Sequence, residues 1–222
     1  MQRESPIARE VLADIDAAAI VPGRPLVAID ADEVLLVFAE HLGRWLGDVG
    51  YDLKLTSYQL EGAIISRDDG MPVGFEAAIS LIDTFFEEEA EQQLPLTGAV
   101  EAVTRLAGDA QVVVLTNIPR LARAARVRNL GGHGLDFPVV ANSGGKGRAL
   151  AMMASRAAAP AVFIDDSPGQ IASAARHAEG VHRLHFRGSP FIQHVLKPAE
   201  AADTVAETWG EAEATIRRHL AL

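Results

Sequence analysis

Short apolar runs that end on polar residues recur along this chain, and this alternation constrains the fold more than any other feature. The clearest runs are "LVAI" before Asp30, "QVVVLT" ending on Thr116, "FPVVAN" ending on Asn142, and "AVFIDD" ending on Asp165 and Asp166. Segments with helical spacing of apolar residues separate them. Strands that alternate with helices through short loops predict a parallel sheet covered on both faces. We therefore expect an α/β protein with a Rossmann-like, three-layer core.

The remaining sequence divides into predicted helices, one further strand and one irregular stretch. The segment "VHRLHF" is expected to be the last strand of the core, and residues 52–75 are rich in turn-forming residues. The arginines of "PRLARAARVR" are expected on a solvated helix face. Apolar spacing predicts helices over residues 5–20, 34–49, 76–93, 99–108, 119–130, 145–158, 170–180 and 201–221.

Composition limits the classes of function. The 222 residues carry a formal net charge of −10, which disfavours binding to nucleic-acid polymers and to anionic membranes. No apolar run approaches the roughly 20 residues that span a bilayer, and acidic residues interrupt the first 20 positions, unlike a secretory signal. The chain has no cysteine, which suits a reducing compartment. We expect a cytoplasmic globular protein that binds a small molecule, and its oligomeric state is left open.

The polar residues that end the predicted strands should meet in space. Right-handed crossovers place the carboxyl ends of parallel strands at one edge of the sheet, where ligands bind. Carboxylates that converge there need a cation, and oxygen ligands without His or Cys favour Mg²⁺. Lys146 in "SGGKGRAL" adds a positive charge, and helix N-terminal amides add donors, so these groups favour a phosphoryl group. The residues expected at this edge are Asp30, Asp32, Thr116, Asn117, Asn142, Ser143, Asp165 and Asp166.

Four short motifs in this order resemble those of the haloacid dehalogenase (HAD) superfamily of phosphatases. The first is "DADEV" at 30–34, which has the DxDx(T/V) form, and the second is Thr116 in "VVVLTN". The third is Lys146, and the fourth is the acidic pair Asp165-Asp166 in "FIDDSPGQI". The resemblance covers about residues 26–186. It implies a HAD-type core and Mg²⁺-dependent hydrolysis of a small phosphorylated metabolite.

The resemblance also implies roles for individual residues. Asp30 would be the nucleophile that forms an aspartyl-phosphate, and Asp32 would donate a proton to the leaving alcohol and then accept one from water. Thr116 and Lys146 would act in catalysis and, with Asn117, would bind the phosphoryl oxygens. The expected metal ligands are Asp30, Asp32 through its backbone carbonyl, Asp165 and Asp166. Which of the last two binds the metal directly is left open, because Asp166 is also a candidate N-cap for the helix that begins near Pro168.

The resemblance also predicts how the chain is divided. Residues 25–39 and 96–222 would form the HAD-like core, residues 40–95 a helical cap of the C1 type inserted after the first motif, and residues 1–24 an N-terminal helical extension. Candidate specificity residues, chosen by position, are Phe38, His41, Trp45 and Tyr58. Packing of the first cap helix is the alternative role for Phe38 and Trp45.

Two further features bear on the substrate. The stretch "VLLVFAEHLGRWLGDVGYDLKLTSYQL" is similar to the opening of the 5′(3′)-deoxyribonucleotidases, which implies a nucleotide substrate. Glu33 departs from the family pattern, because a glycine commonly follows the second aspartate, and it is expected to alter access or docking of the cap.

Three activities remain open at this stage. The first is a Mg²⁺-dependent phosphomonoester hydrolase. The second is a phosphate-binding or protein-interaction module with little turnover, and the third is a phosphomutase that passes the phosphoryl group to a second hydroxyl. A dehalogenase is disfavoured, because haloacid dehalogenases generally lack an aspartate at the position of Asp32.

Overall fold

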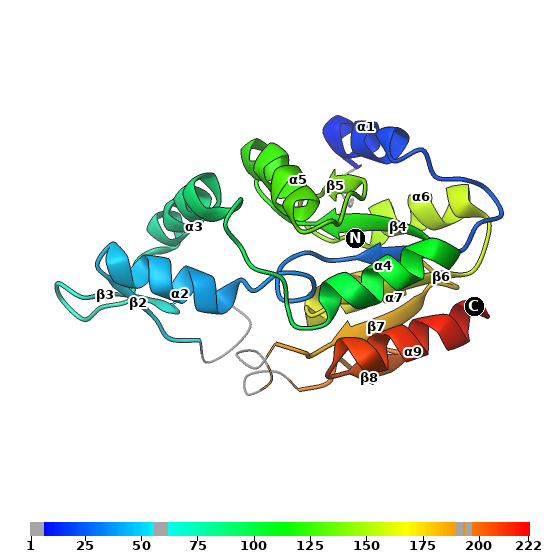
Figure 1. Cartoon of the computed structure of the whole chain (residues 1–222). Coiled ribbons are helices and arrows are strands. Elements are labelled where there is room, and N and C mark those ends of the chain that lie inside the picture. Colours follow the sequence, from blue (N-terminus) through cyan, green and yellow to red (C-terminus); the bar gives the residue numbers. More distant parts are fainter. Residues whose placement is uncertain (1–6, 56–61, 190–192, 194–196) are drawn as a thin grey trace.

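A six-stranded parallel sheet forms the centre of the molecule in the computed structural model, which describes residues 7–55, 62–189, 193 and 197–222. Its strands lie in the order β5-β4-β1-β6-β7-β8, and helices cover both faces (Figure 1). The predicted α/β class and parallel three-layer core are confirmed. The strands are β1 (Leu26–Ile29), β4 (Gln111–Thr116), β5 (Val139–Ala141), β6 (Ala161–Asp165), β7 (His182–Phe186) and β8 (Thr204–Ala206).

Strand β1 lies in the middle of the sheet between β4 and β6. All four of its side chains are fully buried, which explains why the run is apolar without alternation. Ile29 is in register with Val114 of β4 and with Ile164 of β6. The residues that follow these positions therefore leave the sheet at the same edge, as the sequence predicts.

Side chains of β1 alternate between two apolar clusters. Val27 and Ile29 face a cluster with α4 (Ala99–Asp109) and α9 (Trp209–Leu220), and Leu26 and Ala28 face a cluster with the helices of the other side. Those helices are α1 (Arg9–Ala17), α6 (Gly147–Ala157) and α7 (Pro168–His177).

A buried aspartate attaches the N-terminal helix to the core. Asp14 of α1 is 5% exposed, and its Oδ2 accepts a hydrogen bond of 3.1 Å from the backbone N–H of Ala141 in β5. The same carboxylate pairs with Arg120 in the one-turn 3₁₀ helix η1 (Arg120–Ala122) and with Arg123, whose Nε lies 3.1 Å away. Helix α5 (Arg123–Gly132) follows η1 directly.

The segment between β1 and α4, called the cap segment below, forms a small unit beside the sheet (Figure 1). It contains α2 (Ala39–Asp48), an antiparallel hairpin of β2 (Tyr51–Leu53) and β3 (Ile64–Ser66), and α3 (Phe75–Glu89). Leu42, Phe85 and Phe86 pack in its own apolar cluster, which also includes Ile118 of the core. This segment occupies the place of the predicted cap. The predicted domain boundaries themselves stay predictions.

Three expected elements differ in the structure. The helix expected from residue 34 begins at Ala39, because residues 34–36 form a tight turn in which three backbone N–H groups donate to the carbonyl of Ala31. The turn-rich stretch 52–75 contains the β2-β3 hairpin. The last strand is β8, and it takes up the beginning of the expected final helix, which starts only at Trp209. Among the described residues, we find no helix with the length and apolar character that a membrane crossing requires.

Candidate active site

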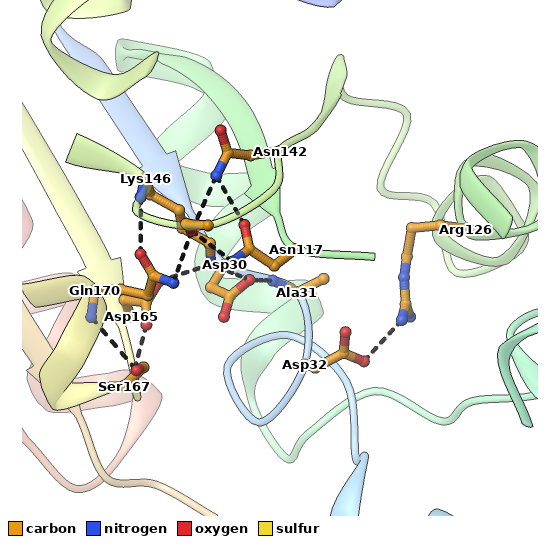
Figure 2. A network of polar contacts seen from close by, with 11 residues as sticks. Asp30, Ala31, Asp32, Asn117, Arg126, Asn142, Lys146, Asp165, Ser167 and Gln170 are labelled. Carbon is orange, nitrogen blue, oxygen red and sulfur yellow. Dashed lines mark hydrogen bonds and ion pairs between the residues drawn. The ribbon is translucent and has the colours of Figure 1, made fainter. Parts of the chain in front are cut away.

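Side chains from three strand ends and one helix start meet at the carboxyl edge of the sheet (Figure 2). Asp30 follows β1, Thr116 ends β4 and Asp165 ends β6. Lys146 is the residue before the first turn of α6. The structure therefore brings together Asp30, Lys146, Asp165 and Asp166. Strand β4 places Thr116 at the same edge of the sheet, where the sequence predicts it.

Lys146 is the electrostatic centre of this group. Its Nζ lies 2.6 Å from Oδ1 of Asp30 and 2.7 Å from Oδ2 of Asp165, and the residue is 1% exposed. Burial opposes its charge, but Asp165 and Asp30 outweigh burial and raise the pKa of Lys146 above its usual value. Its backbone N–H donates 2.8 Å to Oε1 of Gln170 in α7, which fixes the start of α6. The two carboxylates thus hold the ammonium between them and favour its charged form.

Three buried carboxylates could hold a metal ion. Ligand oxygens of Asp30, Asp165 and Asp166 lie within 4.8 Å of one another. Burial, with repulsion from Asp165 and Asp32, raises the pKa of Asp30 to about 7 despite the attraction of Lys146. Burial and the charges of Asp165 and Asp30 also raise the pKa of Asp166 well above its ordinary value. A hard divalent cation fits this all-oxygen set, because it would offset the repulsion that both shifts record.

Backbone donors orient two of these carboxylates. Oδ1 of Asp30 accepts 2.7 Å from the backbone N–H of Ala31, and Oδ1 of Asp165 accepts 2.8 Å from that of Ser167. Ser167 is the N-cap of α7, because its hydroxyl accepts from the N–H of Gln170, and Pro168 occupies the first helical turn. The alternative role of Asp166 as the N-cap of this helix is therefore wrong. Figure 2 shows Asp30, Lys146 and Asp165 pointing toward one another.

Thr116 ends β4, which pairs with β1, and Asn117 follows it, so both lie at the edge of the sheet that carries Asp30. The Oγ1 of Thr116 is buried and has no hydrogen-bond partner within the described ranges, so it is available to a ligand. Asn117 is held by its side chain, whose Nδ2 donates 2.8 Å to the carbonyl of Gly144 and whose Oδ1 accepts 2.9 Å from Asn142. Gly144 has φ +75°, a left-handed conformation that a glycine adopts without strain.

An open pocket of about 650 Å³ borders this edge of the sheet. Asn117, Asn142 and Gly144 line part of its wall. Glu10 and Val11 of α1, Arg120 of η1 and Asp83 of α3 line other parts, and the clustered carboxylates are not among the lining residues.

Asp32 is separated from the metal-ligand cluster. Its carboxylate is not among the clustered oxygens, and Figure 2 shows it turned toward Arg126. Nη2 of Arg126 lies 2.7 Å from Oδ1 of Asp32, and Nε2 of Gln93 donates 3.0 Å to the same oxygen. The side chain of Asp32 therefore does not act as a carboxylate ligand here, and its backbone carbonyl remains the expected ligand atom.

Glu33 connects the first motif to the cap segment. Its Oε1 accepts hydrogen bonds from the backbone N–H groups of Phe38 (3.0 Å) and Ala39, at the start of α2. Burial raises the pKa of Glu33, against the opposite effect of these bonds and of Ser189. The side chain of Glu33 thus anchors the N-terminus of α2, and its influence on docking of the cap stays a prediction.

The candidate specificity residues lie mainly within the cap segment. His41 is 8% exposed, and its Nε2 lies 2.7 Å from Oε2 of Glu89 in α3. Nε1 of Trp45 donates 2.9 Å to Glu88. Phe38 packs against Phe85 and Phe86 with ring centroids 5.6 Å apart in each case. Tyr58 lies outside the described residues.

Sequence reasoning missed Arg126 and Gln93. The arginines of α5 were expected on a solvated face, but Arg126 is fully buried, so that expectation is wrong for this residue. Arg126 lies four residues after Ala122 and four before Leu130, which are both buried, and this i, i±4 spacing was the available signal. Gln93 is fully buried in the connection from α3 to α4, where no periodic pattern marks it.

Comparison with known proteins identifies the fold. A HAD family hydrolase from Deinococcus radiodurans R1, with bound phosphate and sodium, superposes with a TM-score of 0.62 at 18% identity over 87% of this chain and 95% of that one. The chain has the HAD fold. A HAD-like hydrolase from Streptococcus pneumoniae gives 0.62 at 14% identity over 89% and 98% of the two chains. A candidate phosphoglycolate phosphatase from Lactobacillus delbrueckii gives 0.54 at 15% identity over 89% and 99%.

The resemblance to the HAD superfamily is thus confirmed for the fold. Searches of the sequence itself against family models and curated proteins find no match. The likeness to 5′(3′)-deoxyribonucleotidases stays a prediction.

Proposed function

We propose that this protein is a phosphatase of the HAD superfamily, which hydrolyses a small phosphorylated metabolite with Mg²⁺ through an aspartyl-phosphate intermediate. The observation that carries this proposal is the ammonium of Lys146, held 2.6 Å from Asp30 and 2.7 Å from Asp165 inside a buried cluster of carboxylates. In phosphoryl transfer, positioning and neutralisation of charge supply most of the catalysis. This cluster offers both.

The reaction begins when a carboxylate oxygen of Asp30 attacks phosphorus and the bond from phosphorus to the leaving oxygen breaks. Asp32 gives its proton to that oxygen, so that the alcohol departs neutral. Water then attacks phosphorus, gives its proton to Asp32 and releases Asp30 together with inorganic phosphate. The Lys146 ammonium and the Thr116 hydroxyl bind the phosphoryl oxygens, and Asn117, the residue after Thr116, is the further expected phosphate-binding residue.

Asp30, Asp165, Asp166 and the backbone carbonyl of Asp32 are the groups that would hold Mg²⁺. When bound, the ion supplies positive charge that offsets the carboxylates and the phosphoryl oxygens.

The test is a phosphate-release screen with Mg²⁺ over nucleotides, sugar phosphates and small phosphorylated acids. We expect turnover of at least one class, its loss after chelation of the metal, and its restoration by added Mg²⁺. Asp30→Asn should abolish turnover, because the uncatalysed reaction is among the slowest known. A preference for nucleoside monophosphates would support the deoxyribonucleotidase likeness. Isomerised product without free phosphate would identify a phosphomutase, and phosphate binding without turnover would identify a binding module; either result would contradict the proposal.

A further inference from the structure

Arg126 stands on the buried face of α5. It is the largest fully buried side chain of the described residues, and it lies between the apolar positions Ala122 and Leu130. Its guanidinium carbon lies 5.9 Å from the ring centre of Phe86 in α3. Burial of a guanidinium has a large desolvation cost, and a buried ion pair recovers this cost only with complete hydrogen bonding.

The hydrogen bonding of Arg126 is incomplete. Nη2 donates 2.7 Å to Oδ1 of Asp32, whereas Nε and Nη1 are buried and have no hydrogen-bond partner in the described part of the chain. Buried donors in this state lower the free energy of unfolding. Stability therefore gives no reason for an arginine at this position, and its single strong contact is the residue to which the proposed function assigns proton transfer.

Gln93 makes the second contact to the same oxygen. Its Nε2 donates 3.0 Å to Oδ1 of Asp32 and 3.2 Å to the carbonyl of Val37. The backbone carbonyl of Gln93 accepts a hydrogen bond of 2.8 Å from Nδ2 of Asn129 and lies 3.0 Å from Nε2 of His133. Helix α5 and the residue after it therefore hold the backbone of Gln93 in place. Two rigid donors thus converge on Oδ1.

The second carboxylate oxygen of Asp32, Oδ2, is available for proton transfer. No hydrogen bond reaches Oδ2 from the residues that the structure describes, and the Asp32 side chain is 19% exposed, while that of Arg126 is 0% exposed. A carboxylate held through one oxygen has a fixed plane, and its other oxygen keeps a fixed direction. This is the geometry that a proton donor needs.

Both connections between the core and the cap segment lie next to the hydrogen bond between Gln93 and Asp32. The chain leaves the core at Val37, whose N–H donates 2.9 Å to the carbonyl of Leu94, and it returns through Gln93 and Pro95, which bridges to Leu36. Gln93 bonds Asp32 and Val37 at once. A shift of the cap segment would therefore move a ligand of Asp32.

We propose that Arg126 and Gln93 form a buried clamp that positions Asp32 for proton transfer and couples its orientation to the two connections of the cap segment. Both are positioning residues, since neither is placed to touch the phosphoryl group. The inference rests on the proposed function and deepens it, because it assigns residues that orient the proton-transfer group.

The test compares two substrates that differ in their need for a proton. An alkyl phosphate, such as a glycerol phosphate, has a leaving group that must be protonated, whereas the leaving group of p-nitrophenyl phosphate departs as a stable anion. The quantity to compare is kcat/KM, because it reports the steps up to departure of the first product and not the later attack of water. A clamp on the proton donor affects the first substrate selectively.

Arg126→Met removes the guanidinium and keeps an unbranched apolar side chain. We expect kcat/KM for the alkyl phosphate to fall about 100-fold or more, and that for p-nitrophenyl phosphate to fall less than about 10-fold. Arg126→Lys keeps the charge and should recover part of the alkyl phosphate activity. Gln93→Leu should lower the ratio of kcat/KM for the alkyl phosphate to kcat/KM for p-nitrophenyl phosphate, by a smaller factor than Arg126→Met. Arg128→Met is the matched control, because Arg128 lies on the same helix with a side chain 61% exposed and pairs with Glu91 at the surface.

A parallel fall for both substrates, or no fall for either, would overturn the clamp. If thermal melting shows that Arg126→Met does not fold, kcat/KM for the two substrates is compared in Arg126→Lys and Gln93→Leu, which change the clamp less. The alkyl phosphate is chosen among those that wild-type protein hydrolyses in the screen. Failure of the proposed function has a separate signature, since wild-type protein would then release phosphate from no substrate in that screen.

Discussion

At the residue scale, the backbone conformation of Glu33 destabilises the fold, whereas its side-chain hydrogen bonds stabilise it. Its φ is +60°, a left-handed conformation that costs a non-glycine residue about 1 kcal/mol or more. Its carboxylate accepts two backbone N–H groups at the start of α2, which offsets that cost. The residue that departs from the family pattern is therefore retained by a specific contact.

Two substitutions at Glu33 separate these effects. Glu33→Ala loses both hydrogen bonds and keeps the strained backbone, so we expect the free energy of unfolding to fall by about 1–3 kcal/mol. Glu33→Gly loses the same bonds but relieves the strain, and should be less destabilised by about 1 kcal/mol. Urea denaturation of both variants measures the difference. The reverse order would show that the left-handed backbone of Glu33 carries no strain, and no loss of stability in either variant would show that the contact with α2 does not stabilise the fold.

Thr116 should matter for activity and not for stability. Its buried hydroxyl has no hydrogen-bond partner in the residues that the structure describes, so Thr116→Val removes an unsatisfied polar group at nearly constant volume. We expect an unfolding free energy within about 1 kcal/mol of wild type. We also expect a loss of about 100-fold or more in turnover, because a donor to the phosphoryl oxygens is gone. Unchanged turnover would remove Thr116 from the proposed site.

Sequence alone predicts those site residues that end strands. Asp30, Thr116 and Asp165 follow apolar runs, and topology brings such positions together without any knowledge of side-chain packing. Arg126 and the orientation of Asp32 depend instead on which helix face meets which loop. That information lies in tertiary contacts between α5, the cap connections and the first motif, so a run of arginines was interpreted as a solvated face.

At the element scale, short strands and turns account for the differences from expectation. Strand β8 has three residues and β2 and β3 have three each, which is too short for a periodic signal. The turn of residues 34–36 has apolar side chains at positions compatible with a helix, but all three are buried in the core of the sheet. Burial in the core overrides the local helical pattern there.

Docking of α1 gives an element-scale prediction. Asp14 is buried and holds Arg120, Arg123 and the N–H of Ala141, so Asp14→Ala should lower the free energy of unfolding by about 2–4 kcal/mol. Asp16→Ala is the matched control, because its side chain is 67% exposed and pairs with Arg156 at the surface. That change should cost less than about 1 kcal/mol. Equal effects in a denaturant titration would contradict the assigned role of Asp14.

At the scale of the whole molecule, a histidine in the sheet links stability to pH. Burial, with the nearby His219, lowers the pKa of His182 below 6.5, and Arg183 acts in the same direction against Asp203. The His182 and His219 rings stack with centroids 4.0 Å apart, and Nε2 of His182 lies 2.9 Å from Oγ1 of Thr204 in β8. The unfolded chain therefore binds this proton at a higher pH than the folded one.

The contribution of His182 to stability should be complete above about pH 6.5 and should decrease as the pH falls through that value. His182→Gln removes the titrating group, so the unfolding free energy of the variant should fall less than that of wild type between about pH 7.5 and 5.5. Denaturant titrations at the two pH values measure this difference. An equal fall in both proteins would show that His182 does not contribute to the pH dependence.

The central claim is that Asp30 forms a covalent phosphoryl intermediate beside Lys146. Acid quenching during turnover of a phosphorylated substrate with Mg²⁺, followed by peptide mass spectrometry, tests it most directly. We predict one phosphoryl group on the peptide that contains Asp30 and none in Asp30→Asn. With p-nitrophenyl phosphate, whose leaving group needs no proton, we predict a larger amount in Asp32→Asn, because attack of water is slowed. Steady turnover with a phosphoryl group on another residue, or turnover that survives Asp30→Asn, would contradict the account.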